Sequence, residues 1–217
     1  MTYTLAVGTK NWSSWSLRAW LAMKASGAAF TEQFVPLRAT ETSAAASKAS
    51  PSGLVPALTI TDGGAPYAIW DSLAICETLA ERHPEARLWP EAPRARAQAR
   101  AISCEMHSGF VALRQQMSMD FARTIPDVVP TPETAKAITR ILSIWETCRA
   151  SEGGDGPYLF GHFTIADCFY APVVSRFHTY GVATGGAAEA YASAIMSHPF
   201  MREWGRAAAQ EVAEGRA

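Results

Sequence analysis

The strongest constraint on the fold is a change of pattern at a proline-rich segment. Residues 1–82 alternate between strand-like and helix-like runs, whereas residues 93–217 show only helical patterns. Residues 83–92 lie between them and contain Pro84 and Pro90, which interrupt regular structure. We therefore predict an α/β domain over 1–82, a linker over 83–92 and an all-helical domain over 93–217.

The first part of the chain predicts a βαβ unit. Apolar residues alternate from Tyr3 to Val7 as in a strand, and a helical run from Ser14 to Ser26 is closed by Gly27. A second strand is predicted from Phe30 to Leu37. A crossover helix implies that the two strands pair in parallel. The turn before the helix then lies at the carboxyl end of the first strand, where open α/β sheets bind ligands.

The remainder of the first domain predicts a loop, a hairpin and a helix. The small and polar residues from Arg38 to Ser50 indicate a mobile loop with at most a short, weak helix. An Asp-Gly-Gly turn joins a strand around Thr59 to a second strand over Pro66–Trp70, which predicts a β-hairpin. Apolar residues at helical spacing then begin after Asp71, which predicts a helix that ends near Arg82.

The second domain is predicted to be a helical bundle. The expected helices run from Pro93 to about Arg123, from Thr131 to about Ala150, from Thr164 onward, from Gly186 to Met196 and from Pro199 to about Val212. Thr164 with Asp167 three positions later resembles a capping box. We assign that pair a structural role and no chemistry.

The composition indicates which kind of molecule the protein binds. Of the 217 residues, 48% are hydrophobic, so the chain can bury one large core or two modest ones. Nineteen basic against twenty acidic side chains argue against nucleic acid or an anionic membrane as the main partner. No leader pattern and no membrane-spanning apolar run occur, so we expect a cytoplasmic protein that acts on small molecules.

The four cysteines predict neither a disulfide framework nor a metal site. Cys76, Cys104, Cys148 and Cys168 are far apart, form no Cys-x-x-Cys pair and lie in predicted helices. Cysteines without a disulfide pattern are typical of proteins in a reducing compartment. We predict no metal.

A hydroxyl-rich turn from Asn11 to Arg18 is the candidate active site. A helix start leaves backbone N–H groups without partners and carries a partial positive charge. Serines at this position can therefore cap the helix and also hold an anion. Capping alone is the alternative interpretation.

Four motifs occur in order along the chain. They are Ser-Ser-Trp-Ser-Leu-Arg at 13–18, Ser-Pro-Ser-Gly-Leu-Val-Pro-Ala-Leu at 50–58, Asp-Ser-Leu-Ala-Ile at 71–75 and Phe-Thr-Ile-Ala-Asp at 163–167. Together they resemble the glutathione S-transferase superfamily, over nearly the whole chain. The Ser-Ser-x-Ser-x-Arg motif is most similar to the bacterial, serine-type, zeta-like branch. The resemblance implies a thioredoxin-like N-terminal domain, an all-α C-terminal domain and a homodimer.

The resemblance also implies roles for particular residues. Val55 would pair its backbone with the cysteinyl part of glutathione beside a cis Pro56, and Asp71 and Ser72 would hold the γ-glutamyl end. A serine at the start of the first helix would face the thiol. Ser13 is the first choice for this catalytic role, and Ser14 is the alternative.

Three features depart from the family pattern or extend it. Trp15 stands where the zeta-like branch has a cysteine, and Leu54 stands where many relatives have a lysine that holds the glycyl carboxylate. Lys48 or Arg38 are candidates to replace that lysine. The Glu-Met-His segment ending at His107 resembles the beta-type branch, in which a histidine lines the site.

The electrophilic second substrate also needs an apolar surface to bind against. Trp12, Trp15 and His107 are the candidates for that wall, with core packing as the alternative for the tryptophans and surface or packing for the histidine.

These residues can activate a thiol without a metal or a general base. Lowering the pKa of a free thiol from about 8.5 by about two units requires about 2.7 kcal/mol. A hydroxyl hydrogen bond to charged sulfur contributes about 1.5–3 kcal/mol, and a helix start about 0.3–1 kcal/mol. We therefore expect a glutathione S-transferase that uses reduced glutathione as co-substrate, with no other cofactor.

Other functions remain open. A glutathione-dependent isomerase or peroxidase, or a non-catalytic binding module of the same fold, fits the same motifs. A serine hydrolase is less consistent with the sequence, because no Gly-x-Ser-x-Gly motif surrounds Ser13.

Overall fold

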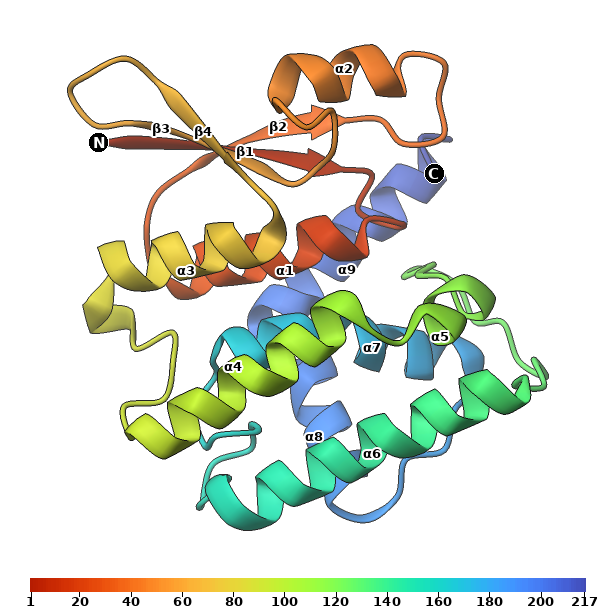
Figure 1. The fold of residues 1–217 in the computed structure, drawn as a ribbon. Coiled ribbons are helices and arrows are strands. Elements are labelled where there is room, and N and C mark those ends of the chain that lie inside the picture. The colour runs from red at the N-terminus through yellow and green to blue at the C-terminus, as the bar shows by residue number, and fades with distance from the viewer.

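A four-stranded sheet with three helices is packed on a second, all-helical half (Figure 1). The computed structural model describes residues 1–217. The elements of the first half are β1 (Thr2–Gly8), α1 (Ser14–Ala25), β2 (Thr31–Val35), α2 (Thr42–Ala49), β3 (Ala57–Thr61), β4 (Tyr67–Trp70) and α3 (Ser72–Arg82). Helices α1 and α3 lie on the face of the sheet that is turned toward the helical half, and α2 lies on the opposite face (Figure 1).

The sheet has the strand order β2-β1-β3-β4. Strand β1 pairs with β2 in parallel, with Thr4 opposite Thr31, so the predicted βαβ unit is confirmed. The remaining pairs are antiparallel, and Ala57 lies opposite Trp70 in the predicted hairpin. This topology places the end of β1 and the start of β3 next to each other, which brings two of the sequence motifs to one edge.

The segment from Arg38 to Ser50, predicted as a mobile loop with at most a short, weak helix, contains the two-turn helix α2. Ala46 and Ala49 of this helix are buried against small side chains of the sheet, among them Ala6. Alanine has the highest helix propensity, and packing of one apolar face is what stabilises most short helices.

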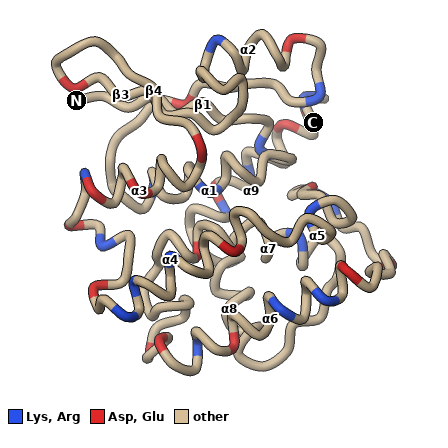
Figure 2. Tube along the Cα trace, in the orientation of Figure 1, with Lys and Arg blue, Asp and Glu red and all other residues tan.

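The second half consists of six α-helices that follow a 3-10 turn at Pro84–Ala86. They are α4 (Pro93–Ser108), α5 (Val111–Gln116), α6 (Pro132–Glu152), α7 (Ile165–Tyr180), α8 (Gly186–Ser197) and α9 (Pro199–Ala213). The all-helical class is confirmed. Lys and Arg are interspersed with Asp and Glu over both halves (Figure 2), and no helix is both long and apolar enough to cross a membrane.

The single helix expected from Pro93 to about Arg123 is instead two helices with a break between them. Gly109 is extended, and Phe110 adopts the left-handed conformation with φ of 56°. A Cβ on Gly109 would lie 2.6 Å from the backbone oxygen of Glu105, so only glycine fits this close approach. The break turns α5 away from the axis of α4.

One continuous hydrophobic core joins the two halves. Helix α7 lies at its centre, and every residue of α7 except His178 is buried. Helix α1 packs directly on α7. The start of α1 therefore faces the second half of the molecule rather than solvent.

The start of α7 is held by a buried carboxylate, as the predicted capping box requires. Asp167 accepts hydrogen bonds from the backbone N–H of Thr164 at 2.8 Å, from the Thr164 hydroxyl at 3.0 Å and from the backbone N–H of Leu159 at 3.2 Å. Burial raises the pKa of Asp167 to about 6, and these hydrogen bonds oppose that rise.

Replacing this carboxylate tests its structural role. Asp167→Ala leaves two buried backbone donors without an acceptor, and we expect it to lower the free energy of unfolding by about 3 kcal/mol. Urea denaturation followed by circular dichroism measures the change. The matched control is Asp155→Ala in an exposed turn, which should stay within about 0.5 kcal/mol of the parent protein. Equal effects of the two substitutions would contradict the assignment.

Candidate active site

The hydroxyl-rich turn lies between β1 and α1 and is held by its own hydrogen bonds. The Ser13 side chain caps α1 by accepting from the Ser16 backbone N–H at 3.3 Å. Its hydroxyl donates to the Ser16 hydroxyl at 2.7 Å, and the Gly8 backbone N–H donates to that same oxygen at 3.1 Å. Ser13 is buried, and its proton is used inside the turn.

Ser14 is placed differently. Nη2 of Arg176, on α7, donates a hydrogen bond to the Ser14 hydroxyl oxygen at 3.1 Å. Arg176 also donates to the carbonyl oxygens of Met117 at 2.9 Å and Pro172 at 3.0 Å. Because the Ser14 oxygen accepts from a cation, its own proton stays available for another acceptor.

A cavity of about 280 Å³ lies beside this turn. Its wall consists of Trp15, Ser52, Leu54, Val55, Pro56, Trp70, Asp71 and Ser72. The Val55–Pro56 peptide bond is cis. The structure thus brings the four residues predicted to hold the cysteinyl and γ-glutamyl parts of glutathione into one wall, together with Trp15.

Other predicted site residues lie outside this wall. They are Ser13, Ser14, Trp12 and His107. The Trp12 ring lies 4.4 Å from the guanidinium carbon of Arg38, which makes it a partner of that side chain. Arg38 and Lys48 are both exposed and are not part of the cavity wall, while Leu54 is 70% exposed at its rim.

Asp71 connects the two halves of the molecule. It caps α3 by accepting from the Leu73 backbone N–H at 2.8 Å, and its other oxygen lies 3.1 Å from Nε2 of His107 on α4. The adjacent Ser72 hydroxyl is buried and has no hydrogen-bond partner. A buried hydroxyl without a partner at a cavity wall is available to a ligand.

His107 packs edge-on against the Trp15 ring, with ring centroids 5.1 Å apart. Burial lowers the pKa of His107, as do the charges of Arg18 and Arg114, while Asp71 opposes that shift. The imidazole is therefore neutral at pH 7. Its Nε2–H then faces Asp71, and its buried Nδ1 has no partner.

Three arginines meet around Trp15 and Ser14, and the sequence reading assigned none of them a role. The guanidinium carbon of Arg18 lies 4.3 Å from the Trp15 ring and 4.9 Å from the Phe169 ring. That of Arg114, on α5, lies 5.4 Å from the Trp15 ring. We call Arg18, Arg114 and Arg176 the arginine cluster. The one available signal in the sequence was Arg176, an arginine in the middle of a mostly apolar predicted helix.

The cluster members differ in how their charge is satisfied. Arg18 is fully buried, and none of its three nitrogens has a hydrogen-bond partner. Burial, together with the positive charges of Arg176 and Arg114, lowers the pKa of Arg18 to about 9. Burial also lowers the pKa of Arg176 to about 10, but all three of its nitrogens donate hydrogen bonds.

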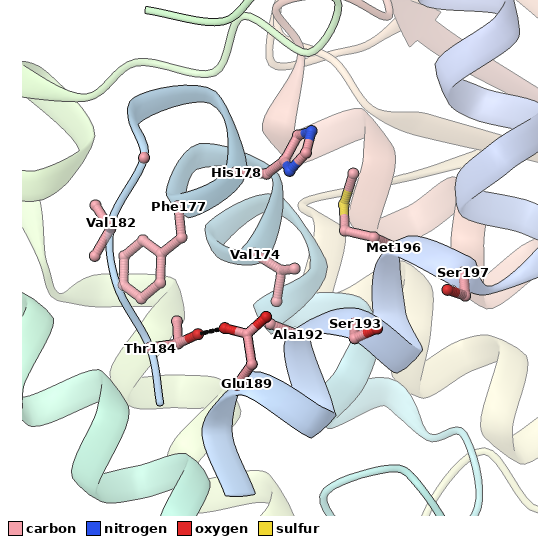
Figure 3. A pocket seen from close by; sticks show the side chains of 11 residues that line it. Val174, Phe177, His178, Val182, Thr184, Glu189, Ala192, Ser193, Met196 and Ser197 are labelled. Carbon is pink, nitrogen blue, oxygen red and sulfur yellow. Dashed lines mark hydrogen bonds between the residues drawn. The ribbon is translucent and has the colours of Figure 1, made fainter. Parts of the chain in front are cut away.

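A larger cavity of about 480 Å³ lies elsewhere, between α7, α8 and the loop that joins them (Figure 3). Apolar side chains such as Val174, Phe177 and Met196 line it, and Thr184 donates a hydrogen bond to Glu189 at its edge. None of the motif residues belongs to it. No three His, Cys, Asp or Glu side chains in the protein come together as metal ligands.

Comparison with known proteins matches both halves to one family. The model of the glutathione S-transferase N-terminal domain matches residues 12–82, and that of the C-terminal domain matches residues 130–207. A probable maleylacetoacetate isomerase from Caenorhabditis elegans is 37% identical over 100 residues, which is 46% of this chain and 44% of that protein. The chain spans about half the length of the curated relatives it matches.

Solved structures share the fold over the whole chain. A glutathione transferase homolog from Burkholderia with bound glutathione has a TM-score of 0.71 at 21% identity, covering 97% of this chain and all of that one (100%). Maleylacetoacetate isomerase from Anaeromyxobacter dehalogenans with bound glutathione has a TM-score of 0.67 at 24% identity, covering 94% of each chain.

The two fully buried arginines are expected to respond to substitution with opposite signs. Arg18→Met removes a buried charge without hydrogen bonds, so the free energy of unfolding should rise by about 1–4 kcal/mol. Arg176→Met removes three charged hydrogen bonds and leaves the Met117 carbonyl oxygen without its donor, so the free energy of unfolding should fall by about 3 kcal/mol. Urea denaturation at pH 7 measures both. Destabilisation of the protein by Arg18→Met would show that its charge is compensated in the folded state.

Proposed function

Because the chain belongs to the glutathione S-transferase family, we propose that it binds reduced glutathione in the cavity beside Val55 and directs the glutathione thiolate at an electrophilic, mostly apolar small molecule. The observation that carries this proposal is the single cavity wall shared by Val55, Pro56, Asp71 and Ser72 next to the start of α1.

The wall offers a complementary group for each part of the tripeptide that it is proposed to hold. The backbone of Val55 pairs with the cysteinyl unit, as strand-like pairing requires. The carboxylate of Asp71 accepts from the γ-glutamyl ammonium, and the unpartnered Ser72 hydroxyl donates to the γ-glutamyl carboxylate. His107 holds one oxygen of Asp71 from the opposite half and so fixes the direction of this carboxylate.

The start of α1 supplies the stabilisation of the thiolate. The sulfur loses its proton to solvent, attacks the electrophilic carbon and forms a C–S bond while the leaving group departs with its electron pair. A serine hydroxyl donates to the charged sulfur and is not itself a nucleophile. Ser13 and Ser14 are the candidates, and the hydrogen bond from Arg176 makes Ser14 the stronger donor.

A second candidate function is glutathione-dependent isomerisation. It is supported by the similarity to a probable maleylacetoacetate isomerase, while Trp15 replaces the cysteine of the zeta-like branch. A glutathione-dependent peroxidase and a non-catalytic binding module remain further alternatives. Conjugation of a chloronitrobenzene, isomerisation of a cis-dienone and reduction of an organic peroxide give different products and separate the three reactions.

The proposal includes a cytoplasmic homodimer that serves detoxification.

Retention on immobilised glutathione tests the binding half of the proposal. The protein should remain on the resin and elute with free reduced glutathione, because the cavity wall recognises both ends of the tripeptide. Asp71→Asn should elute earlier, since the ammonium loses its charged acceptor. Passage of the parent protein straight through the column would favour the non-catalytic binding module.

Substitution of the two serines tests whether a serine hydroxyl stabilises the thiolate of bound glutathione. Loss of one hydroxyl hydrogen bond should raise the thiol pKa of bound glutathione by about one to two units and lower conjugation about 10- to 100-fold while sparing binding. The absorbance of the thiolate as a function of pH measures this pKa. We expect this effect in Ser13→Ala or Ser14→Ala, and full turnover in both variants would place the role on another group.

A further inference from the structure

The turn between β1 and α1 is held by the C-terminal helix as well as by its own hydrogen bonds. Helix α9 contacts α1, and its C-terminal part reaches this turn (Figure 1). Oε2 of Glu211, on α9, accepts a hydrogen bond from the backbone N–H of Asn11 at 3.2 Å. The indole N–H of Trp204, on the same helix, donates to the backbone oxygen of Lys10 at 3.0 Å. Two consecutive residues of the turn are thus bound to a helix from the opposite end of the chain.

Asn11 carries this connection on to a second segment of the helical half. Its side-chain N–H donates to Asp120 at 2.7 Å, and its side-chain oxygen accepts from the Ala122 backbone N–H at 2.8 Å. Its backbone oxygen accepts from the Phe121 N–H at 3.0 Å. The backbone and the side chain of Asn11 are therefore both engaged, and the residue is only 1% exposed.

Helix α9 and the loop at 120–122 also lie directly against each other. A Cβ on Gly205 of α9 would lie 2.8 Å from the Phe121 ring, so even the methyl group of an alanine would displace the ring. The turn, the loop and α9 therefore meet in one packed contact, which the C-terminal helix closes.

Glu211 is a buried carboxylate without an ion pair. It is 4% exposed, and the two cations whose charge reaches it, Lys10 and Arg216, pair with other carboxylates. Burial raises the pKa of Glu211, while its backbone hydrogen bonds oppose the rise. Burying a carboxylate costs free energy that an apolar side chain would not cost. The need for a strong acceptor at the Asn11 N–H accounts for its presence, because a carboxylate accepts more strongly than a neutral oxygen.

The position of Asn11 determines the position of the serines that follow it. The backbone N–H groups of Trp12 and Ser13 both donate to the Thr9 oxygen, at 3.1 and 2.9 Å. Asn11 lies inside this turn, so a displacement of Asn11 passes directly to Ser13 and to Ser14, the first residue of α1. A hydrogen bond from a hydroxyl depends steeply on distance and angle, so a small displacement weakens it.

We propose that Glu211 and Asn11 are positioning residues that hold the serine hydroxyls in place relative to bound glutathione. Glu211 fixes the backbone of Asn11 to α9, and the Asn11 side chain fixes the turn to the loop at 120–122. Neither residue lines the glutathione cavity, so both act through the turn. The inference rests on the proposed function and extends its machinery to the C-terminal helix.

Kinetics with glutathione and a chloronitrobenzene test the positioning role. Glu211→Ala removes the acceptor from the Asn11 N–H, and we expect kcat to fall about 10-fold while the KM for glutathione stays within about twofold, because the cavity wall is unchanged. The thiol pKa of bound glutathione should rise by about one unit, which the absorbance of the thiolate as a function of pH measures. Glu211→Gln keeps an acceptor oxygen and should restore most of kcat.

Two further variants make the result specific. Asn11→Ala removes the two side-chain hydrogen bonds to the loop and should lower kcat by a similar factor. The matched control is Glu214→Ala, an exposed carboxylate just after the last turn of α9, which should keep the parent kcat and thiol pKa. A lower free energy of unfolding with unchanged kcat and thiol pKa in both Glu211→Ala and Asn11→Ala would show a structural role alone and overturn the proposal. Failure of both variants to fold would overturn it as well.

Hydrogen–deuterium exchange separates this inference from the proposed function, because it needs no glutathione. The amides of residues 10–16 should exchange about 10-fold faster in Glu211→Ala than in the parent protein, while those of α7 stay unchanged. The same result in a protein that does not bind glutathione would support the hold of α9 on the turn and contradict the proposed function. Unchanged exchange of residues 10–16 would show that Glu211 does not hold the turn and would overturn the inference.

Discussion

The hydrogen bond between Arg176 and Ser14 joins the two halves of the molecule at the point where α1 begins. Arg176 lies on the most deeply buried helix, and its other two donors are fixed on the carbonyl oxygens of Met117 and Pro172. The guanidinium therefore cannot follow the serine if the turn moves. The position of the hydroxyl relative to the cavity is set by the packing of α1 on α7, and not by the turn alone.

This arrangement explains why the site lies between domains. The α/β half supplies the helix start and the cavity wall with Val55 and Asp71, and the helical half supplies His107 and two of the three arginines. A fold with either half alone would leave Asp71 without its histidine and Ser14 without its cation. Charge of one sign is concentrated where the core is continuous, so its electrostatic influence is stronger than it would be in water.

The sequence predicted those features that depend on neighbours in the chain. The βαβ unit, the hairpin and the capping box at Thr164 all follow from local periodicity or from residues three positions apart. Helix α2 was predicted as a short, weak helix at most, because its stability comes from burying alanines against the sheet, which is a tertiary contact. The break after α4 was missed because it depends on the left-handed conformation of Phe110. The arginine cluster brings together three distant segments, so no spacing in one chain could reveal it.

The choice between Ser13 and Ser14 shows where sequence reasoning stops. Similarity to serine-type relatives favours the first serine, and that serine is indeed the N-cap of α1. An N-cap hydroxyl is held by the backbone, however, and here its proton is donated to Ser16. The second serine has its oxygen occupied by a cation and its proton free. A hydroxyl stabilises an anion through its proton, so the serine that caps the helix and the serine that meets the sulfur can be two different residues. Which of them acts depends on hydrogen positions that are set by Ser16 and Arg176 rather than by the motif.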